Sequence, residues 1–438
     1  MMCETNRSGY ITLLVTSILL LLTLIVSLAA SKGVFFQIKI AQNELKARQA
    51  HWKAEGGLEC AYSQIKSEIL TLPLSGAVSL TGCTPAVSIE KVSNSDFIVK
   101  SKQADTQLKK VMFAPNTGLG AVLKTSASVE LTGSMHFVPQ ADGPVSESEC
   151  TSIVSGGSVN YVSSTSGTDE HFLSVDSTLI SHSTVPSTPT FTCKDSHRSN
   201  LFDSAKTPKY LEDVTPTPVS IKGKDIQENV TDISAFYDLF NQEFNASNVA
   251  KLRNEIQTDP VGIVLDTDKT AKGWIKSCHT KLDNAYKAGK RRFWIDGSCA
   301  ITGNIFGDST QSEENAVQLI VYDGLLYIKA MSYFDGLLYQ YVAKTFGAKE
   351  AWLDLFDSQS TIGVNPTSFH KHDVESNSAY NKYPFLLDGS LHLDGGLGLD
   401  VQDRTIKLNG SLIPAYNGGK IGKHITKIEW QRGSWNDL

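Results

Sequence analysis

The amino-terminal part of the sequence lacks charged residues and proline. No Asp, Glu, Lys or Arg stands between Tyr10 and Ala30, and no proline precedes Pro73. Proline interrupts helices, so its absence permits one helix across the whole segment. An uncharged helix over residues 10–30 is long enough to span the ~30 Å apolar core of a bilayer at 1.5 Å per residue. A secretion signal has a shorter apolar core, so simple secretion is disfavoured, although Ser27-Leu28-Ala29 fits a signal-peptidase site.

An excess of positive charge is also missing. The chain has 40 Lys and Arg against 46 Asp and Glu, a net charge of −6. Binding to nucleic acid needs concentrated basic residues, so the charge balance argues against nucleic acid as a partner. We interpret the tightest basic run, Lys290-Arg291-Arg292, as a solvated strand edge.

Catalytic motifs are missing as well: there is no nucleophile elbow, phosphate-binding loop, His-Glu-x-x-His or dinucleotide fingerprint. Two stretches carry metal-ligating residue types. One is HKHDVE, with His370, His372, Asp373 and Glu375; the other is DGGLGLDVQ, Asp394 to Gln402, which resembles one calcium-binding nonapeptide. We interpret the first as a solvated loop, and the second would need stacked copies that the sequence does not contain. We therefore expect no catalytic residue, metal or cofactor.

The cysteines form no Cys-x-x-Cys pair, which disfavours zinc and thioredoxin-like chemistry. Of the seven cysteines, Cys3 lies near the amino terminus, and an even number follows it: Cys60, Cys83, Cys150, Cys193, Cys278 and Cys299. An even number fits disulfides formed in an oxidising compartment. Six cysteines allow 15 connectivities. We favour pairing between sequence neighbours, while free buried thiols remain an alternative for some of them.

An amphipathic run follows the apolar stretch without interruption. Its apolar residues recur at helical spacing: Val34, Phe35, Ile38, Ala41, Leu45, Trp52, Leu58, Tyr62, Ile65 and Ile69. The pattern predicts one helix over residues 10–70, about 90 Å long at 1.5 Å per residue. Gly56-Gly57 is its weak point, because each glycine costs about 1 kcal/mol relative to alanine.

Composition divides the rest of the chain into four regions. Residues 71–205 are rich in Ser and Thr with short strand patterns, and residues 206–225 contain three prolines and are expected to be a linker. Residues 226–290 carry helical patterns, and residues 291–438 are rich in β-branched and aromatic residues.

Short apolar runs in this last region are separated by Asp-Gly or Asn-Gly. The corners are Asp296, Asp323, Asp335, Asp388, Asp394 and Asn409, and Leu-Leu-Tyr follows the glycine after both Asp323 and Asp335. Glycine supplies the positive φ that such corners need. The repeat indicates either hairpins or the coils of a β-solenoid. We favour a β-solenoid or stacked-sheet head over a sandwich.

The first 65 residues resemble the precursors of type IV pilins, in particular PilX-type minor pilins and the pseudopilins of type II secretion. The resemblance rests on SGYITLLVTSILLLLTLIVSLAAS and on AQNELKARQAHWKAEGGLECA. The closing ITKIEWQRGSWNDL is similar to the carboxyl ends of PilX-type proteins. The resemblance implies a leader, residues 1–9, that prepilin peptidase removes after Gly9, leaving Tyr10 as the amino terminus, which is typically N-methylated.

Two residues depart from the family pattern. Major pilins carry Glu at the fifth mature position, which here is Leu14, and the first mature residue is Tyr10 where Phe or Met is commoner. Absence of that Glu is typical of the K-type pseudopilins, which cap the filament tip. The resemblance therefore implies a tip or initiation position for this chain.

The sequence thus predicts an α+β chain: a long pilin-like transmembrane helix followed by a mainly β head. The expected role is a non-catalytic minor pilin that is first a single-pass inner-membrane protein, with its body outside the cytoplasm, and then part of an extracellular pilus. Its expected partners are prepilin peptidase, the inner membrane and other pilins through the helix. Two alternatives stay open: a tip adhesin whose tyrosines (Tyr322, Tyr327, Tyr333, Tyr339 and Tyr341) contact a surface glycan or host ligand, and a secreted β-solenoid carbohydrate-active enzyme.

Overall fold

The computed structural model describes residues 7–66, 77–80, 82–92, 96–113, 119–142, 147–164, 169–175, 191–206, 208–212, 216, 218–306, 315–364, 371–425, 429–431 and 436–437. Contacts divide the chain into two compact units. Unit 1 consists of residues 1–115 and 427–438, and unit 2 of residues 116–426. Unit 2 is therefore an insertion in the chain of unit 1.

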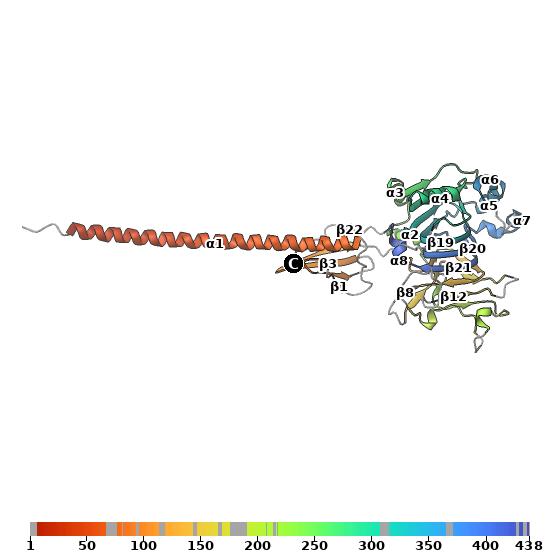
Figure 1. Cartoon of the computed structure of the whole chain (residues 1–438), viewed down its shortest axis with the longest axis horizontal. Coiled ribbons are helices and arrows are strands. Elements are labelled where there is room, and N and C mark those ends of the chain that lie inside the picture. The colour runs from red at the N-terminus through yellow and green to blue at the C-terminus, as the bar shows by residue number, and fades with distance from the viewer. Residues whose placement is uncertain are drawn as a thin grey trace, which may run out of the picture. The chain divides into compact units, whose positions relative to one another are not determined.

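Unit 1 combines one long helix with an antiparallel sheet (Figure 1). Helix α1 spans Arg7–Lys66, and the strand order is β1-β2-β3-β4-β22, with β23 also paired to β4. The strands are β1 (Ala77–Leu80), β2 (Val87–Lys91), β3 (Asp96–Gln103), β4 (Thr106–Phe113), β22 (Glu429–Trp430) and β23 (Asn436–Asp437). The last two follow unit 2 in the chain, so this sheet is completed only by residues on both sides of the insertion.

The last turns of α1 pack on this sheet. Ala54, Leu58, Ala61 and Ile65 share one face of the helix and are buried. They pack with residues of the sheet side: Leu80, Val87, Ile89, Phe97, Val99, Leu108 and Met112. A Cβ at Gly57 would overlap Ser101 Oγ, so the glycine allows the helix and β3 to approach closely. The helix runs through Gly57 without interruption.

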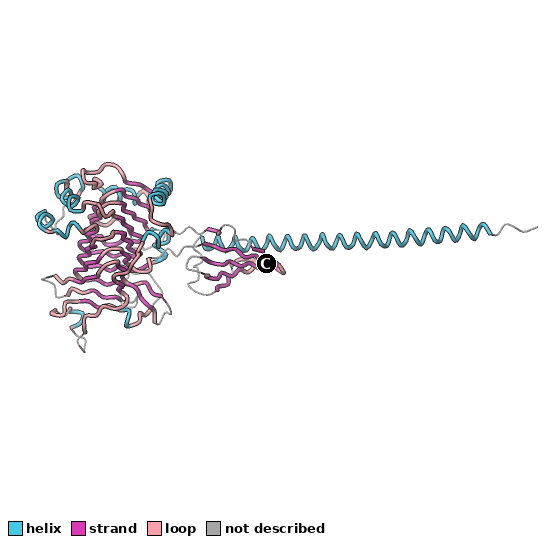
Figure 2. The backbone as a smooth tube through the Cα atoms, turned by 180° about the vertical axis from the view of Figure 1, so that it is seen from behind, coloured by secondary structure: helices cyan, strands magenta, loops and turns pink. Residues whose placement is uncertain are grey.

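Unit 2 is built from stacked, mostly parallel strands (Figure 2). Its main sheet contains β5 (Leu123–Thr125), β6 (Ser128–Thr132), β7 (Met135–Phe137), β10 (Ile153–Ser155), β11 (Val159–Tyr161), β12 (Phe172–Ser174), β13 (Asn200–Leu201), β14 (Ile226–Gln227), β15 (Gly262–Leu265), β16 (Arg292–Asp296), β17 (Cys299–Ile301), β18 (Val317–Tyr322), β19 (Leu326–Tyr341), β20 (Phe385–Asp400) and β21 (Thr405–Tyr416). A separate antiparallel pair is formed by β8 (Gln140–Asp142) and β9 (Glu149–Thr151).

Pairing sorts these strands into three rows. The first row runs from β15 through β16, β18, the ends of β19 and β20, and β5 to β10 and β14. The second contains β17, the beginnings of β19, β20 and β21, then β6 and β11. The third contains the middle of β19 and β20, the end of β21, then β7 and β12. These pairs are parallel, so the hairpin interpretation of the Asp-Gly repeat is wrong for β18, β19 and β20.

The long strands pass from row to row at glycines with positive φ. Gly336 and Gly395 follow Asp335 and Asp394, have φ values of 128° and 157°, and are register partners. A Cβ on Gly395 would overlap the carbonyl oxygen of Gly336. Both the backbone conformation and the close approach of the neighbouring chain therefore require glycine, as the sequence predicted for these corners.

The two ends of unit 2 lie side by side. Leu123 of β5 pairs with Leu397 of β20, and β6 pairs with β21, so residues 119–227 extend the stack formed by residues 262–416. The structure therefore divides the chain differently from the expected regions 71–205, 206–225, 226–290 and 291–438. Within the expected linker, Ile221 forms a bridge with Asn200, and Leu211 is buried.

Helices cover two of the three rows. The first row is covered by α2 (Ala235–Phe240), α3 (Ala246–Thr258) and α8 (Gly418–Gly422), which pack around Trp294, Ile320 and Leu337. The second is covered by α5 (Ala348–Asp357), α6 (Gln359–Ile362) and α7 (Lys371–Ser376), around Tyr327 and Trp352. Helix α4 (Cys278–Lys287) packs into the main core through Leu282.

Candidate functional site

The part of α1 that precedes its packed face is apolar and exposed. The helix from Tyr10 to Ile65 is long and apolar enough to cross a membrane, and its most apolar stretch is 0% buried within the chain. Exposed residues of this stretch include Leu14, Leu20 and Ile25. An apolar helix of this length near the amino terminus is compatible with a membrane anchor or with a signal sequence.

Hydroxyl groups within this stretch bond to the helix backbone. Four of them donate to a carbonyl oxygen three or four residues earlier: Thr16 to Thr12 (3.0 Å), Ser17 to Leu14 (2.9 Å), Thr23 to Leu20 (2.9 Å) and Ser31 to Ser27 (2.7 Å). Such bonds satisfy the hydroxyls without water. The stretch can therefore enter an apolar environment without leaving these donors unpaired.

The residues expected at a leader junction lie at the start of this surface. Gly9 and Tyr10 belong to the first turn of α1, and Leu14 lies about one turn further on. The side chains of Tyr10 and Leu14 are exposed. Residues 1–6 of the expected leader lie outside the described residues.

A second cluster joins the carboxyl-terminal strand β22 to α1. The ring of Trp430 stacks on Tyr62 with 5.1 Å between centroids, and its Nε1 donates to Glu59 Oε1 at 3.0 Å. Lys110 of β4 places Nζ 3.6 Å from Glu59 Oε1 and 4.3 Å from the centroid of the Trp430 ring. Burial lowers the pKa of Lys110, and the nearby Glu59 offsets only part of that effect. Trp435 lies outside the described residues.

The cysteines of the structure form three disulfides, Cys60–Cys83, Cys150–Cys193 and Cys278–Cys299. Each cysteine is bonded to the next one along the chain, which is the pairing favoured from the sequence. The first disulfide joins α1 to the segment between β1 and β2 in unit 1, and the other two lie within unit 2. Disulfides persist in oxidising compartments, so this set suits an exported chain.

The carboxylates of the calcium-like stretch bind protein groups. Lys420 Nζ lies 2.7 Å from Asp394 Oδ2 and 2.9 Å from Asp335 Oδ1, and all three side chains are buried. Burial lowers the pKa of Lys420, but the two carboxylates outweigh it, so the pKa is raised above its usual value. Asp400 accepts hydrogen bonds from the backbone N–H groups of Ala235 (2.9 Å) and Phe236 (2.8 Å).

The other metal candidates lie around α7. His372, Asp373 and Glu375 belong to this helix, and His370 lies outside the described residues. Within the part of the chain that the structure describes, no three His, Cys, Asp or Glu side chains are grouped as a metal ion would require.

The tyrosines considered for contact with a ligand fall into two groups. Tyr327 and Tyr339 are buried, whereas Tyr322, Tyr333 and Tyr341 are partly exposed. The adhesin alternative, which needs these tyrosines at the surface, is therefore not supported by Tyr327 and Tyr339. Tyr327 packs in the cluster that includes α5, and Tyr339 packs with α2.

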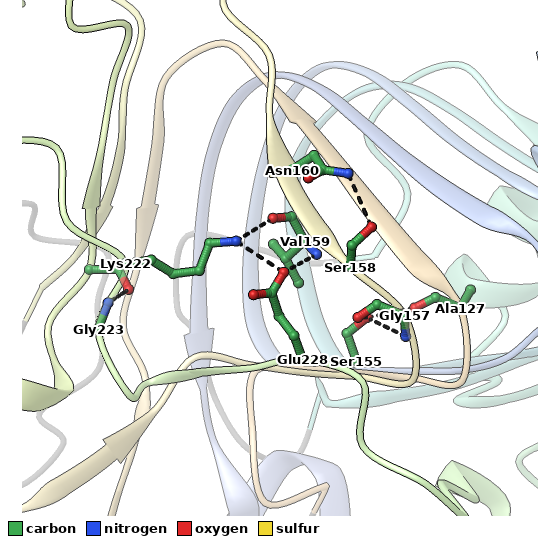
Figure 3. A network of polar contacts seen from close by, with 10 residues as sticks. Ala127, Ser155, Gly157, Ser158, Val159, Asn160, Lys222, Gly223 and Glu228 are labelled. Carbon is green, nitrogen blue, oxygen red and sulfur yellow. Dashed lines mark hydrogen bonds and ion pairs between the residues drawn. The ribbon is translucent and has the colours of Figure 1, made fainter.

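A polar network holds the segment before α2 against β10 and β11 (Figure 3). Lys222 Nζ donates to the carbonyl oxygen of Val159 at 2.7 Å and to Glu228 Oε1 at 3.0 Å, and the same Glu228 oxygen accepts from Val159 N. Ser155 Oγ donates to the carbonyl oxygen of Ala127 at 2.7 Å. The bonds to Val159 connect residues 222–228 with β11, and the bond of Ser155 connects β10 with the loop between β5 and β6.

Comparisons with protein-family models, curated proteins and solved structures found no match to this chain. Its function is therefore inferred from its own residues and contacts.

Proposed function

We propose that this chain is a minor pilin or pilin-like structural subunit of a type IV pilus or related secretion filament. The observation that carries the proposal is the division of α1 into two parts. Ala54, Leu58, Ala61 and Ile65 pack on an antiparallel sheet, while the preceding apolar residues from Tyr10 onward are uncovered within the chain. Removing such a surface from water is favourable by about 25 cal/mol of free energy per Å². In this proposal the surface is buried in the bilayer before assembly and against the helices of neighbouring subunits after it.

The proposal has further parts. In it, the leader is cut after Gly9, and the body lies outside the cytoplasm, where the disulfides of the chain would be stable. Leu14, in place of an acidic residue, favours a position at the filament tip or in an initiation complex. We interpret the three parallel rows of unit 2 as the coils of a β-solenoid head, a role that needs no catalytic residue.

A charge within the apolar stretch tests the proposal. Leu20→Asp should prevent incorporation into filaments, because a carboxylate is costly in an apolar surrounding. Val219→Asp in unit 2 is the matched control, since Leu20 and Val219 are both 70% exposed. The measurement is the amount of chain in sheared filaments, together with the filament count. Normal incorporation of the Leu20→Asp chain would contradict the proposal.

The mature amino terminus provides an independent test. Mass spectrometry of the chain from its native host should find a protein that begins at a methylated Tyr10. A terminus near Ala30 would instead indicate a removed secretion signal and would favour a secreted enzyme.

A further inference from the structure

The stack of unit 2 ends on one side in an open strand. Strand β15 is the terminal strand of the first row and pairs only with β16 among the residues that the structure describes. A terminal strand presents a line of backbone N–H and C=O groups to its surroundings. Proteins usually cover or block these groups, because another strand can pair with them.

Alternate residues of β15 direct their backbone groups away from β16. The carbonyl oxygen of Val261 accepts from Arg292 N at 3.0 Å, so Val261 faces β16. Backbone groups alternate in direction along a strand, so those of Gly262 and Val264 point the other way. Gly262 N donates to the carbonyl oxygen of Asp259 at 2.9 Å. Within the described ranges, the C=O group of Gly262 and both backbone groups of Val264 form no hydrogen bond.

At the other end of the stack, the terminal strands of two rows are covered. Val159 of β11 turns its backbone groups away from β6, and these groups bind the side chains of Lys222 and Glu228 (Figure 3). Strand β12, which ends the third row, pairs with β13. The contrast indicates that strand addition is blocked at these positions and permitted at β15.

The side chains of β15 also suit a paired strand. Ile263 and Leu265 are partly buried against the main core, and Val264 is partly buried against the cluster that includes α3. The strand contains no proline and no charged residue that would oppose pairing. A neighbouring strand would therefore cover apolar surface as well as the open backbone groups.

The order of these residues is self-complementary in an antiparallel arrangement. If Val264 of one copy lies opposite Val264 of another, the two residues exchange both of their N–H···O=C bonds. Ile263 of each copy then faces Leu265 of the other, which gives two apolar cross-strand pairs. The carbonyl oxygen of Gly262 meets the N–H group of Asp266. Every open group identified above thus finds a partner in a second copy.

Charge favours the same orientation. Lys290 Nζ donates to the carbonyl oxygen of Pro260 at 2.8 Å, which places a cation at the beginning of β15, and the exposed Asp266 and Asp268 follow its end. Antiparallel strands bring the beginning of one copy to the end of the other, whereas parallel strands would align like charges. Both carboxylates have ion pairs within the chain, so charge contributes to orientation more than to affinity.

We propose that β15 pairs with β15 of a second copy of this chain, in an antiparallel register centred on Val264. A two-fold contact of this kind is closed, so it joins two copies and no more. The contact belongs to unit 2 and does not need removal of the leader or assembly through α1. Its failure would therefore leave the proposed pilin role untouched.

Cysteine crosslinking of the full-length chain in detergent micelles tests the contact. All variants carry Cys3→Ser, since the other native cysteines form disulfides. In the proposed pair, Val264→Cys places the thiols on Cα atoms about 5.5 Å apart, within reach of a disulfide. Mild oxidation should crosslink this variant at least about tenfold faster than Val219→Cys, an exposed control in unit 2, because pairing raises the effective concentration of the thiols.

A mixing experiment tests the register. Chains with Ile263→Cys and chains with Leu265→Cys should crosslink to each other, because these residues lie opposite in the proposed pair. Neither chain should crosslink readily with itself, because its two thiols are then on diagonal positions about 7–8 Å apart, beyond the reach of a disulfide. If Val264→Cys loses the cooperative thermal transition of the parent chain, this mixing experiment decides alone.

Removal of one backbone donor provides a further check. Val264→Pro deletes the N–H group that the two copies would exchange, and the pairing of β15 with β16 does not use this group. Added to both mixed chains, it should slow their crosslinking at least about tenfold, the effect of about 1.4 kcal/mol.

Two results would overturn the proposal. One is crosslinking of Val264→Cys no faster than that of Val219→Cys. The other is crosslinking of the Ile263→Cys and Leu265→Cys chains with themselves as fast as with each other. Either result would show that a second copy does not cover β15 in this register and would leave the strand to a different protein.

Discussion

Among the residues that the structure describes, each unit buries one lysine, and the two lysines differ in their partners. The Lys110 side chain in unit 1 is 5% exposed, but its partner Glu59 is 53% exposed at 3.6 Å. Lys420 in unit 2 is 0% exposed and lies between Asp335 and Asp394, which are 3% and 10% exposed. Burial lowers the pKa of Lys110, whereas for Lys420 the two carboxylates outweigh burial and raise the pKa.

The difference shows that burial alone does not decide what a lysine contributes. Glu59 is in contact with water and stays hydrated whether or not a cation is beside it. Asp335 and Asp394 have little access to water, and Lys420 places a cation beside both buried carboxylates. We therefore expect the charge of Lys420 to matter more to the stability of unit 2 than the charge of Lys110 does to unit 1, where the Lys110 side chain also packs against Trp430.

The largest expected effect follows from removing the charge in unit 2. Lys420→Met should lower the free energy of unfolding of unit 2 by about 3–5 kcal/mol, because two buried carboxylates lose their cation. Pulse proteolysis of the full-length chain in urea, with peptides assigned to each unit by mass spectrometry, measures this change. Lys344→Met is the control: its ion pair with Asp403 is exposed, so its loss should cost at most about 1 kcal/mol. A Lys420→Met chain as stable as the control would contradict the argument.

The second prediction compares the two parts of α1. Leu58→Ala should destabilise unit 1 by about 2–5 kcal/mol, because Leu58 is buried against the sheet. Leu20→Ala makes the same change on the exposed part and should leave the unfolding of the sheet within about 0.5 kcal/mol of the parent chain. The same proteolysis assay, read on peptides of β2 to β4, separates the two. If Leu58→Ala and Leu20→Ala destabilised the sheet equally, the face of α1 that contains Leu58 would not be the one that packs on the sheet.

Local patterns in the sequence predicted the features that depend on neighbouring residues. The uncharged stretch from Tyr10 to Ala30 lies in α1, and the Asp-Gly corners at Asp335 and Asp394 adopt the expected glycine conformation. Cysteines near each other in sequence are paired. These features depend on the spacing of apolar residues, on the positive φ that glycine allows, and on the closure of short loops between cysteines. All three can be read from residues close together in the sequence.

Contacts between distant segments were not predictable in the same way. The carboxyl-terminal ending was recognised by its resemblance, but nothing in it shows that Trp430 binds Glu59 or that β22 extends β4. No local pattern marks Lys420, because its two carboxylate partners lie on strands earlier in the chain. The rings of Phe244 and Tyr341 have centroids 4.2 Å apart although the two residues are far from each other in sequence. Such pairings follow from the order of the strands, which composition does not encode.

A smaller effect is expected for the lysine of unit 1. Lys110→Met should change the free energy of unfolding of unit 1 by no more than about 1 kcal/mol, because its partner Glu59 remains hydrated and methionine fills similar space. The measurement is the urea midpoint of unit 1 at neutral pH. Glu59→Gln, which removes the other member of the pair, serves as the control and should behave alike. If Lys110→Met lowered the free energy of unfolding as much as Lys420→Met does, the two buried lysines would not differ as we infer.

The smallest and most specific effect is the response of the two lysines to alkaline pH. The folded-state pKa of Lys110 lies below 10.5, so between these values the unfolded chain binds more protons there and the contribution of Lys110 to stability rises with pH. The folded-state pKa of Lys420 lies above 10.5, so its contribution is complete below 10.5 and is lost as pH rises through the folded-state value. Each slope is at most about 1.4 kcal/mol per pH unit.

Urea midpoints from pH 9 to pH 11 for the parent chain and the two Lys→Met variants isolate these contributions, since all other titrating groups are shared. As pH rises, the parent chain should become more stable relative to Lys110→Met. The advantage of the parent chain over Lys420→Met should shrink over the upper part of the same range. Shifts of the same sign in both comparisons would mean that the two lysines occupy equivalent environments, because opposite signs require one folded-state pKa below and one above the unfolded value.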